Sequence, residues 1–290
     1  MRIREYIVIV ALLLTLPLYG GAQVGASPEQ EEQFMYYWYA AKEAIQNEQY
    51  PEAYVLLQFC DELKPNDVQT LYYLGVMHEA LKHEQEAKAY YERAYKLVGN
   101  GKMPEDLPER LKMIYIHEEQ WDKAIQMQDA IDKINGYDGY SAITRYRIYA
   151  LANQPKKAIK AVDDYLKTDP DNIRFLMFRI DLTEQTSGKK KTLYALYERV
   201  LELDPYNTMV LNNYAYHLAT HGGDLTKAEQ MSAITIREEP NNPTFLDTYG
   251  WIMHLKGQDE LAKFYLNKAL WNVTSEANRE VIKKHLEAIK

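Results

Sequence analysis

The sequence is poor in cysteine, glycine and proline for a chain of 290 residues. A single cysteine, Cys60, excludes an intramolecular disulfide and a cysteine-rich metal site. Only 13 glycines and 11 prolines interrupt the chain, which favours helices over many short, turn-connected strands. A basic excess is missing as well, because 34 Lys and Arg stand against 42 Asp and Glu. The net charge of −8 would repel a phosphate backbone, so we expect no nucleic-acid partner.

The chain also has no apolar run of the roughly 20 residues that a membrane-spanning helix needs. Its most apolar stretch, Ile7–Leu18, has 12 residues, follows Arg2 and Arg4, and is followed by small residues up to Ala22. A basic start, a short apolar core and small residues in this order are typical of a secretory signal peptide. We therefore expect a signal peptide over residues 1–22, cleaved after Ala22 or Ala26, and export to the periplasm.

Residues 23–33, which follow the expected signal peptide, are polar and contain Pro28, so we expect a flexible lead-in there. No cysteine lies near either cleavage position, which excludes the lipid-modified cysteine of a bacterial lipoprotein. We expect the mature chain to have no transmembrane segment.

Self-similarity accounts for most of the remaining sequence. A tetrapeptide with proline in second place and Asp or Asn in last place occurs four times, as Lys64-Pro65-Asn66-Asp67, Asp169-Pro170-Asp171-Asn172, Asp204-Pro205-Tyr206-Asn207 and Glu239-Pro240-Asn241-Asn242. Its prolines are 105, 35 and 35 residues apart, and 105 is three periods of 34 plus 3. Proline follows the end of a helix, and Asn or Asp caps the start of the next one. The tetrapeptide therefore marks the boundary between successive helix pairs.

Two further columns repeat with the same period. The first is alanine at six of seven positions, namely Ala53, Ala87, Ala124, Ala158, Leu193, Ala228 and Ala262. The second follows it by seven residues, is mostly small or apolar, and comprises Cys60, Ala94, Ile131, Tyr165, Val200, Thr235 and Ala269. Residues seven apart lie on one face of a helix, so the columns predict a helix that packs closely on its neighbour.

The repeat resembles the tetratricopeptide repeat (TPR) of 34 residues. The clearest copies contain Leu71-x2-Leu74-Gly75-x2-His78 with Ala87-x3-Tyr91, and Leu246-x2-Tyr249-Gly250-x2-Met253 with Ala262-x3-Leu266. The middle repeats depart from this pattern, because Lys112, Tyr146 and Ile180 replace the small residue. The stretch from Tyr206 to Trp271 is similar to TPR proteins of Gram-negative cell envelopes. The resemblance implies an all-α, right-handed superhelical solenoid of about seven helix pairs.

The period divides the chain into seven expected repeats, residues 34–67, 68–101, 105–138, 139–172, 173–207, 208–242 and 243–276. Residues 277–290 form a last amphipathic segment, in which Val281, Ile282, Leu286 and Ile289 are apolar among Lys and Glu. A terminal repeat without a cover would expose its apolar face to water. We therefore expect a capping helix over 277–290, with Ser275 as its N-cap.

In such a solenoid the first helices of successive pairs line a long concave face, where residues at equivalent positions form the contact surface. Tyr, Trp and Arg dominate binding hot spots. We predict a groove for a peptide or a partner protein, with contact residues Tyr72, Tyr140, Arg147, Arg174, Asn212, Asn213, Tyr216 and Trp251. Two alternatives remain: binding of a glycan or small molecule by the Tyr and Trp rings, and a purely structural role in an envelope assembly.

Two arginines interrupt the apolar pattern of the first helices. Arg145 and Arg179 lie 34 residues apart in a column that otherwise holds large or apolar core residues. Buried guanidinium groups need carboxylate partners, and we expect these partners among Asp163, Asp164 and Asp181. The alternative is an arginine-lined spot for an acidic group in the middle of the solenoid.

No catalytic motif accompanies the repeat. The sequence contains no nucleophile elbow, phosphate-binding glycine loop or dinucleotide fingerprint. His217 and His221 have the spacing of a helical metal site, but the pattern supplies no third ligand. Binding of chaperone tails, which in some TPR proteins uses Lys and Asn in one repeat, is not expected because Met177 and Asp181 occupy those positions. We therefore expect a binding scaffold without enzyme activity, metal or cofactor.

Overall fold

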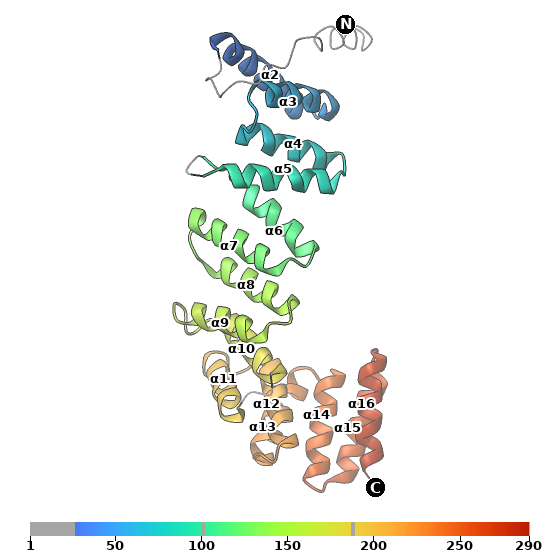
Figure 1. Cartoon of the computed structure of the whole chain (residues 1–290). Coiled ribbons are helices and arrows are strands. Elements are labelled where there is room, and N and C mark those ends of the chain that lie inside the picture. Colours follow the sequence, from blue (N-terminus) through green and yellow to red (C-terminus); the bar gives the residue numbers. More distant parts are fainter. Residues whose placement is uncertain (1–26, 100–101, 187–188, 290) are drawn as a thin grey trace. The chain divides into compact units, whose positions relative to one another are not determined.

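The computed structural model describes residues 27–99, 102–186 and 189–289, and the predicted signal peptide, residues 1–22, lies outside them. Every regular element in the described ranges is a helix (Figure 1). These helices are α2 (Pro28–Gln46), α3 (Tyr50–Leu63), α4 (Val68–Ala80), α5 (Glu84–Leu97), α6 (Leu107–His117), α7 (Trp121–Asn135), α8 (Gly139–Leu151), α9 (Pro155–Leu166), α10 (Ile173–Gln185), α11 (Lys190–Leu203), α12 (Thr208–Thr220), α13 (Leu225–Glu238), α14 (Pro243–Leu255), α15 (Asp259–Asn272) and α16 (Glu276–Ala288). The predicted all-α fold is confirmed.

The helices follow the period read from the sequence. Five first helices begin at the first residue of an expected repeat, namely at Val68, Gly139, Ile173, Thr208 and Pro243. Six first helices pack against the second helix of their own pair, namely α2, α4, α8, α10, α12 and α14, and each second helix packs against the next first helix. The same neighbour packing repeats along each compact part of the chain, which is the arrangement of a solenoid.

The tetrapeptides end in the N-caps that the sequence predicted. Asp67, Asn172 and Asn207 each accept a hydrogen bond from the backbone N–H three residues later, at 2.8, 3.3 and 3.1 Å. Asn242 accepts from the backbone N–H groups of Thr244 and Phe245. Each side-chain oxygen thus satisfies a donor that has no partner within its helix.

The expected lead-in over residues 23–33 is wrong for residues 28–33, which form the first turns of α2. Ser27 is an N-cap whose hydroxyl accepts from the backbone N–H of Gln30, while the side chain of Gln30 accepts from the backbone N–H of Ser27. Pro28 occupies the first helical turn, where its missing N–H costs nothing. This capping box starts the helix earlier than the polar composition indicated.

The alanine column lies in the core. All seven of its positions are buried, and so are Cys60, Ala94, Val200, Thr235 and Ala269 of the second column. Small residues let the paired helices approach closely: a Cβ built on Gly75 would lie 2.5 Å from Cε1 of Tyr91, and one built on Gly250 would lie 2.8 Å from Cγ of Leu266. Close packing of this kind at the two clearest repeats explains why a glycine stands at each position.

The middle repeats accommodate larger residues at this position in different ways. Lys112 is buried, and its Nζ donates to Oε2 of Glu109 at 2.7 Å. Tyr146 remains partly exposed and stacks on Phe178, with 4.5 Å between ring centroids. Ile180 is buried in the apolar core of the C-terminal repeats. A buried ammonium needs such a carboxylate partner because transfer of an unpaired charge from water is costly.

The chain divides into two compact bodies, an N-terminal body up to Glu118 and a C-terminal body from Glu119 onward. Of the predicted contact residues, Tyr72 belongs to the N-terminal body and the other seven belong to the C-terminal body. Among the described helices, none combines the length and apolar character that a bilayer crossing requires.

The last helix, α16, begins at Glu276, next to the N-cap Ser275. It packs against α15 and α14 of the last repeat. Ile282 and Ile289 are buried in the same core as the residues of α12 to α15, whereas Val281 is exposed. The helix therefore covers the apolar end of the C-terminal body.

Candidate functional site

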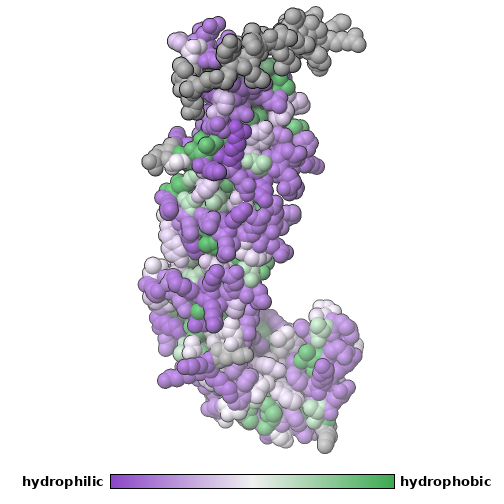
Figure 2. Space-filling model, in the orientation of Figure 1, coloured by the Kyte–Doolittle hydropathy of each residue, from purple (hydrophilic) through white to green (hydrophobic). Residues whose placement is uncertain are grey.

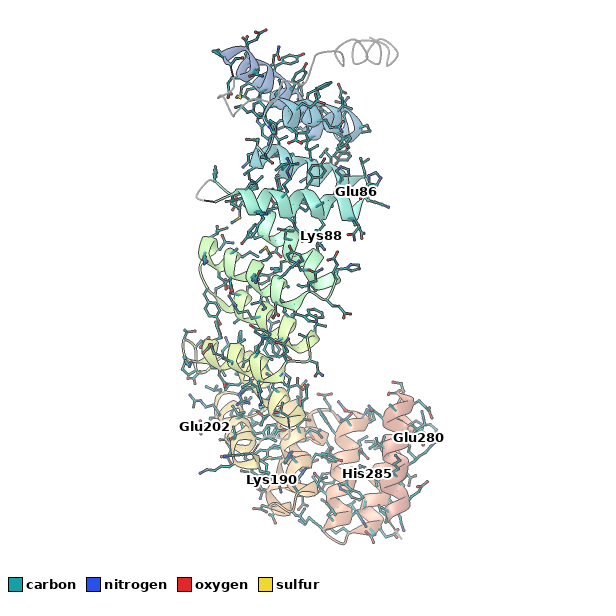
Figure 3. All side chains as sticks on the ribbon, viewed as in Figure 1. Glu86, Lys88, Lys190, Glu202, Glu280 and His285 are labelled. Atoms are coloured by element: carbon teal, nitrogen blue, oxygen red, sulfur yellow. The ribbon has the colours of Figure 1, made fainter. Side chains whose placement is uncertain are left out.

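Helix α16 continues the pattern of the first helices. His285 lies 34 residues after Trp251, which lies 35 residues after Tyr216. The His285 ring stacks on the Trp251 ring with centroids 4.4 Å apart and planes 21° apart, and its centroid is 6.5 Å from that of Tyr216. Figure 3 labels His285 on α16. Because the three rings occupy equivalent positions, α16 acts as the first helix of an eighth repeat.

A cavity of about 510 Å³ opens on this side of the C-terminal body. Four successive first helices contribute to its wall, α10 through one residue and α12, α14 and α16 through several each. The lining residues are Glu184, Asn212, Asn213, Tyr216, His217, His221, Pro243, Thr244, Asp247, Thr248, Asn278, Val281 and Ile282. Its volume is that of a small-molecule or side-chain site.

Two adjacent amides from α12 contribute to this wall. Asn213 is exposed, whereas Asn212 is only 4% exposed. Nδ2 of Asn212 donates to Oδ1 of Asn213 at a long 3.4 Å, and no described residue donates a hydrogen bond to the buried Oδ1 of Asn212. A buried amide oxygen without a donor costs about 1–3 kcal/mol, which a ligand with N–H or O–H groups would recover.

On the α14 side of the cavity a carboxylate is paired with an imidazole. Oδ1 of Asp247 and Nδ1 of His285 are 2.8 Å apart, and their side chains are 12% and 13% exposed. Burial and the negative charge of Asp247 raise the pKa of the Tyr216 phenol. Tyr216 therefore keeps its proton at neutral pH and can donate a hydrogen bond to a ligand.

On the α12 side two imidazoles stack on each other. The rings of His217 and His221 are parallel within 6°, with 4.0 Å between centroids. Burial, with smaller contributions from the charges of His221 and Lys190, lowers the pKa of His217. His217 is therefore neutral at pH 7. Within the described ranges no group of three or more His, Cys, Asp or Glu side chains could hold a metal ion.

Asn212, Asn213 and Tyr216 of the predicted contact set line the cavity, and Trp251 lies beside it against His285. Tyr140, Arg147 and Arg174 are exposed on α8 and α10 but are not part of the lining. The guanidinium of Arg174 lies 5.8 Å from the ring centroid of Phe178.

Tyr72 does not present a free surface in the N-terminal body. It is buried, and its hydroxyl donates to Oδ1 of Asp106 at 2.6 Å. Arg110 bridges Asp106 and Glu79 through hydrogen bonds of 2.8 and 2.6 Å, and Tyr91 also donates to Glu79. The phenol of Tyr72 is thus held in an internal network, which the period alone does not reveal.

The two interrupting arginines are paired with carboxylates, as their position predicted. Arg179 donates to Asp163 at 2.7 Å, which was among the expected partners. Arg145 instead pairs with Asp129 and Asp132 of the preceding helix α7. Asp164 and Asp181 were the wrong candidates, since Asp164 pairs with Lys160 and Lys167 and Asp181 accepts from Gln185.

The contact prediction omitted several residues of the wall, chiefly Asp247, Thr244 and Asn278. It also omitted His285, which pairs with Asp247 behind the wall. Asp247 and Thr244 occupy the same columns as Asn212 and Arg174, one or two repeats later. Asn278 continues the Thr244 column into the last helix. His285 continues the column of Tyr216 and Trp251. These two residues were missed because residues 277–290 were interpreted only as a capping helix. Extending the period beyond residue 276 would have found them.

Comparisons with known proteins agree with this architecture. A TPR repeat-containing protein of Pseudomonas aeruginosa is 29% identical over 196 residues, which are 66% of this chain and 32% of that protein. The chain thus spans about a third of the length of this curated relative. No protein-family model matches the chain.

Two solved structures have a similar course of the backbone. The C-terminal part of a TPR repeat-containing protein from Cytophaga hutchinsonii has a TM-score of 0.52 at 15% identity, and the match covers 74% of this chain and 87% of that one. A tetratricopeptide repeat protein from Parabacteroides merdae has a TM-score of 0.42 at 15% identity, and the match covers 88% of this chain and 98% of that one. The 34-residue period, the successive helix pairs and the likeness to the Cytophaga structure show that this chain has the helical-repeat fold of TPR proteins.

Proposed function

We propose that the chain is an exported, non-catalytic interaction protein that holds an extended segment of a partner protein along the first helices of its C-terminal body. The observation that carries this proposal is the cavity of about 510 Å³ at Asn212, Asn213 and Tyr216, which four successive first helices build together. An extended peptide that crosses these helices would contact each of them in turn.

The chemistry of the wall supports a peptide ligand. Side-chain amides of Asn212, Asn213 and Asn278 can both donate to and accept from a peptide backbone. The Tyr216 ring offers a rigid apolar contact with a hydroxyl donor, a combination that is common in binding hot spots. Most of the face seen in Figure 2 is hydrophilic, with hydrophobic residues in scattered patches. Specific polar contacts at the cavity therefore suit this surface better than a broad apolar interface does.

A binding role is favoured over catalysis by the surroundings of His285. Asp247 and His285 form the carboxylate–imidazole pair that orients a general base in many hydrolases. In nucleophilic catalysis such a base needs a hydroxyl or thiol within hydrogen-bond reach, and no described Ser, Thr or Cys is hydrogen-bonded to His285. The Trp251 ring also covers one face of the imidazole. The same stacking leaves less of Trp251 for a sugar ring, which weighs against the glycan alternative.

Export rests on the signal-peptide pattern, and the start of α2 favours one cleavage position. Cleavage after Ala26 would turn the backbone N–H of Ser27, which donates to Gln30, into a charged amine at the positive end of the helix dipole. Cleavage after Ala22 keeps this peptide group. The intact mass of the protein purified from the periplasm tests the choice: a mature chain that begins at Gln23 is expected, and one that begins at Ser27 contradicts it. A chain found only in the cytoplasm contradicts export.

Site-specific photocrosslinking in living cells tests the binding surface. Benzoylphenylalanine at Asn213, which is exposed in the wall, should give a defined protein adduct, and the same group at Trp271, which is 89% exposed on α15, should not. Adding Asn212→Ala should remove the adduct. Equal adducts at both positions would favour the structural alternative, and a saccharide instead of a protein at Asn213 would favour the glycan alternative.

A further inference from the structure

The charged groups in the wall of the cavity have one sign. Glu184 and Asp247 are its carboxylates, and its lining contains neither Lys nor Arg. Lys190 is a cation at the edge of this wall, where its Nζ donates to the backbone carbonyl of the lining residue His221 at 3.1 Å. Figure 3 shows Lys190 on α11. With a neutral His217, the wall attracts positive charge.

A second observation, independent of charge, indicates what a ligand must supply. The buried Oδ1 of Asn212 is a hydrogen-bond acceptor without a donor among the described residues. Oδ1 of Asn213 is a further acceptor on the same helix, and its contact with Nδ2 of Asn212 is long at 3.4 Å. Carboxylates and amide oxygens together form a set of acceptors. The ligand group that completes this set carries several N–H donors.

We propose that the cavity binds a cationic nitrogen group with several N–H donors, supplied by the partner segment that the proposed function places there. A lysine or arginine side chain and a free peptide N-terminus share this chemistry, since each presents at least three donors and a positive charge. Glu184 and Asp247 neutralise the charge, and the amide oxygens of Asn212 and Asn213 accept the remaining N–H groups. A C-terminal carboxylate or an acidic side chain is rejected, because the lining offers it no cation.

Fluorescence polarisation with hexapeptide pools tests the preference. Every pool has an acetylated N-terminus and an amidated C-terminus, and one position is fixed as Arg, Lys, citrulline, Leu or Glu. We expect the Arg and Lys pools to bind at least about tenfold more tightly than the citrulline and Glu pools, because a charge-assisted hydrogen bond exceeds a neutral one by this amount or more. Citrulline keeps the shape of arginine but replaces one NH2 group by a carbonyl oxygen, so it removes the charge and two of the five N–H donors.

A second comparison separates the two sources of the cation. A Leu pool with a free N-terminus is measured against the acetylated Leu pool. If only the free amine restores tight binding, the cavity takes a peptide N-terminus. If the acetylated Arg and Lys pools bind tightly, it takes a side chain. Both results support a cationic ligand.

Charge-removing variants locate the effect at the cavity. Glu184→Gln keeps an acceptor for the hydroxyl of Tyr197 and lies at the surface, so its folding should be unaffected. Asp247→Asn tests the buried carboxylate, with the melting temperature as a check on folding. Either change should weaken the binding of the Arg and Lys pools about tenfold and leave the affinity of the Leu pool unchanged. Glu260→Gln is the control, because it changes the net charge by the same amount at a side chain on α15 that is 96% exposed. It should leave the affinity of every pool unchanged.

The outcomes distinguish this inference from the proposed function. Pools that bind with equal affinity whatever the fixed residue, or that favour Glu, overturn the cationic ligand and leave the peptide-binding proposal intact. Failure of every pool to bind overturns both proposals.

Discussion

His285 stacks on Trp251 at 4.4 Å, although α15 separates their two helices in the chain. The residues are 34 apart, which is one repeat. The last helix thus occupies the place that the first helix of an eighth repeat would take. It closes the apolar core with Ile282 and contributes Asn278 and Val281 to the cavity wall. The end of the solenoid is therefore part of the candidate site.

Ile282→Ala should reduce the free energy of unfolding by about 2–4 kcal/mol, because it removes a fully buried side chain and leaves a cavity. Urea denaturation followed by circular dichroism measures the change. Val281→Ala is the matched control on the same helix: Val281 is exposed, so a change within about 0.5 kcal/mol is expected. Equal losses for the two variants would mean that α16 does not cover the core in this register.

Gly75→Ala should destabilise the N-terminal body by about 1–3 kcal/mol, because the new Cβ would lie 2.5 Å from Cε1 of the buried Tyr91. Thermal denaturation would detect the change. Gly139→Ala is the control at the start of α8, where the nearest atom is the terminal hydroxyl of Tyr165 at 3.0 Å. That hydroxyl can move aside, so Gly139→Ala should reduce the free energy of unfolding much less than Gly75→Ala does. A neutral Gly75→Ala would contradict the close helix approach.

Asp132 should make stability depend on pH. Burial acts to raise its pKa, but hydrogen bonds from Ser141, Arg145 and Gln128 outweigh burial, and the pKa in the folded state lies below the usual value of 3.8. A lowered pKa stabilises the folded state above about pH 4, and this contribution is lost as the pH falls through the folded-state pKa. Asp132→Asn should therefore be less stable than the unmodified chain at pH 7, by about 2–4 kcal/mol, and should lose less stability between pH 5 and pH 3.

Asp129→Asn is the matched control for this pH dependence. Asp129 pairs with the same Arg145 but is 51% exposed, whereas Asp132 is 10% exposed. An exposed ion pair contributes about 0–1 kcal/mol, so this variant should retain the stability and the acid sensitivity of the unmodified chain. Urea midpoints at pH 7, 5, 4 and 3 compare the three proteins. Identical profiles for Asp129→Asn and Asp132→Asn would refute the assignment.

Arg147→Ala and Arg174→Ala test whether the bound segment extends from the cavity toward α8. Both side chains are exposed, so the melting temperature should remain unchanged. If an acidic part of the partner lies over these helices, photocrosslinking at Asn213 should decrease several-fold. Lys160→Ala removes an exposed cation from the second helix α9 and should have no effect. Unaltered crosslinking in both arginine variants would confine the binding surface to the cavity.

Features that repeat along the chain could be predicted from the sequence. The period placed the first residues of α4, α8, α10, α12 and α14. Four of these helices follow a tetrapeptide, which combines a helix-ending proline with a capping Asp or Asn within four residues, whereas α8 follows the capping Asp138 alone. The alanine column and the column seven residues after it identified the core, because residues seven apart lie on one face of a helix. This geometry is local and does not depend on distant parts of the chain. The early start of α2 was missed although the Ser27 and Gln30 pair is equally local, because the polar composition was given more weight than the capping box.

The candidate site could be predicted only in part. The columns indicated Asn212, Asn213 and Tyr216, which do line the cavity. They could not distinguish these residues from Tyr72, which occupies the column of Asn212 four repeats earlier but is buried against Asp106. Both positions are buried, but the Tyr72 hydroxyl has Asp106 as a partner whereas Oδ1 of Asn212 has no described donor. Equivalent positions thus differ in their hydrogen-bond partners, because those partners belong to other helices.

The sequence by itself determined the helix pairs, their order and the core columns, since each depends on residues close together in the chain. The tertiary structure alone decided that Asp247 meets His285 and that Asn212 keeps a buried oxygen without a donor. These features arise between side chains from helices one or more repeats apart. Their distances, burial and unpaired atoms depend on how the helices stack, and the stacking is set by the packing of the whole C-terminal body.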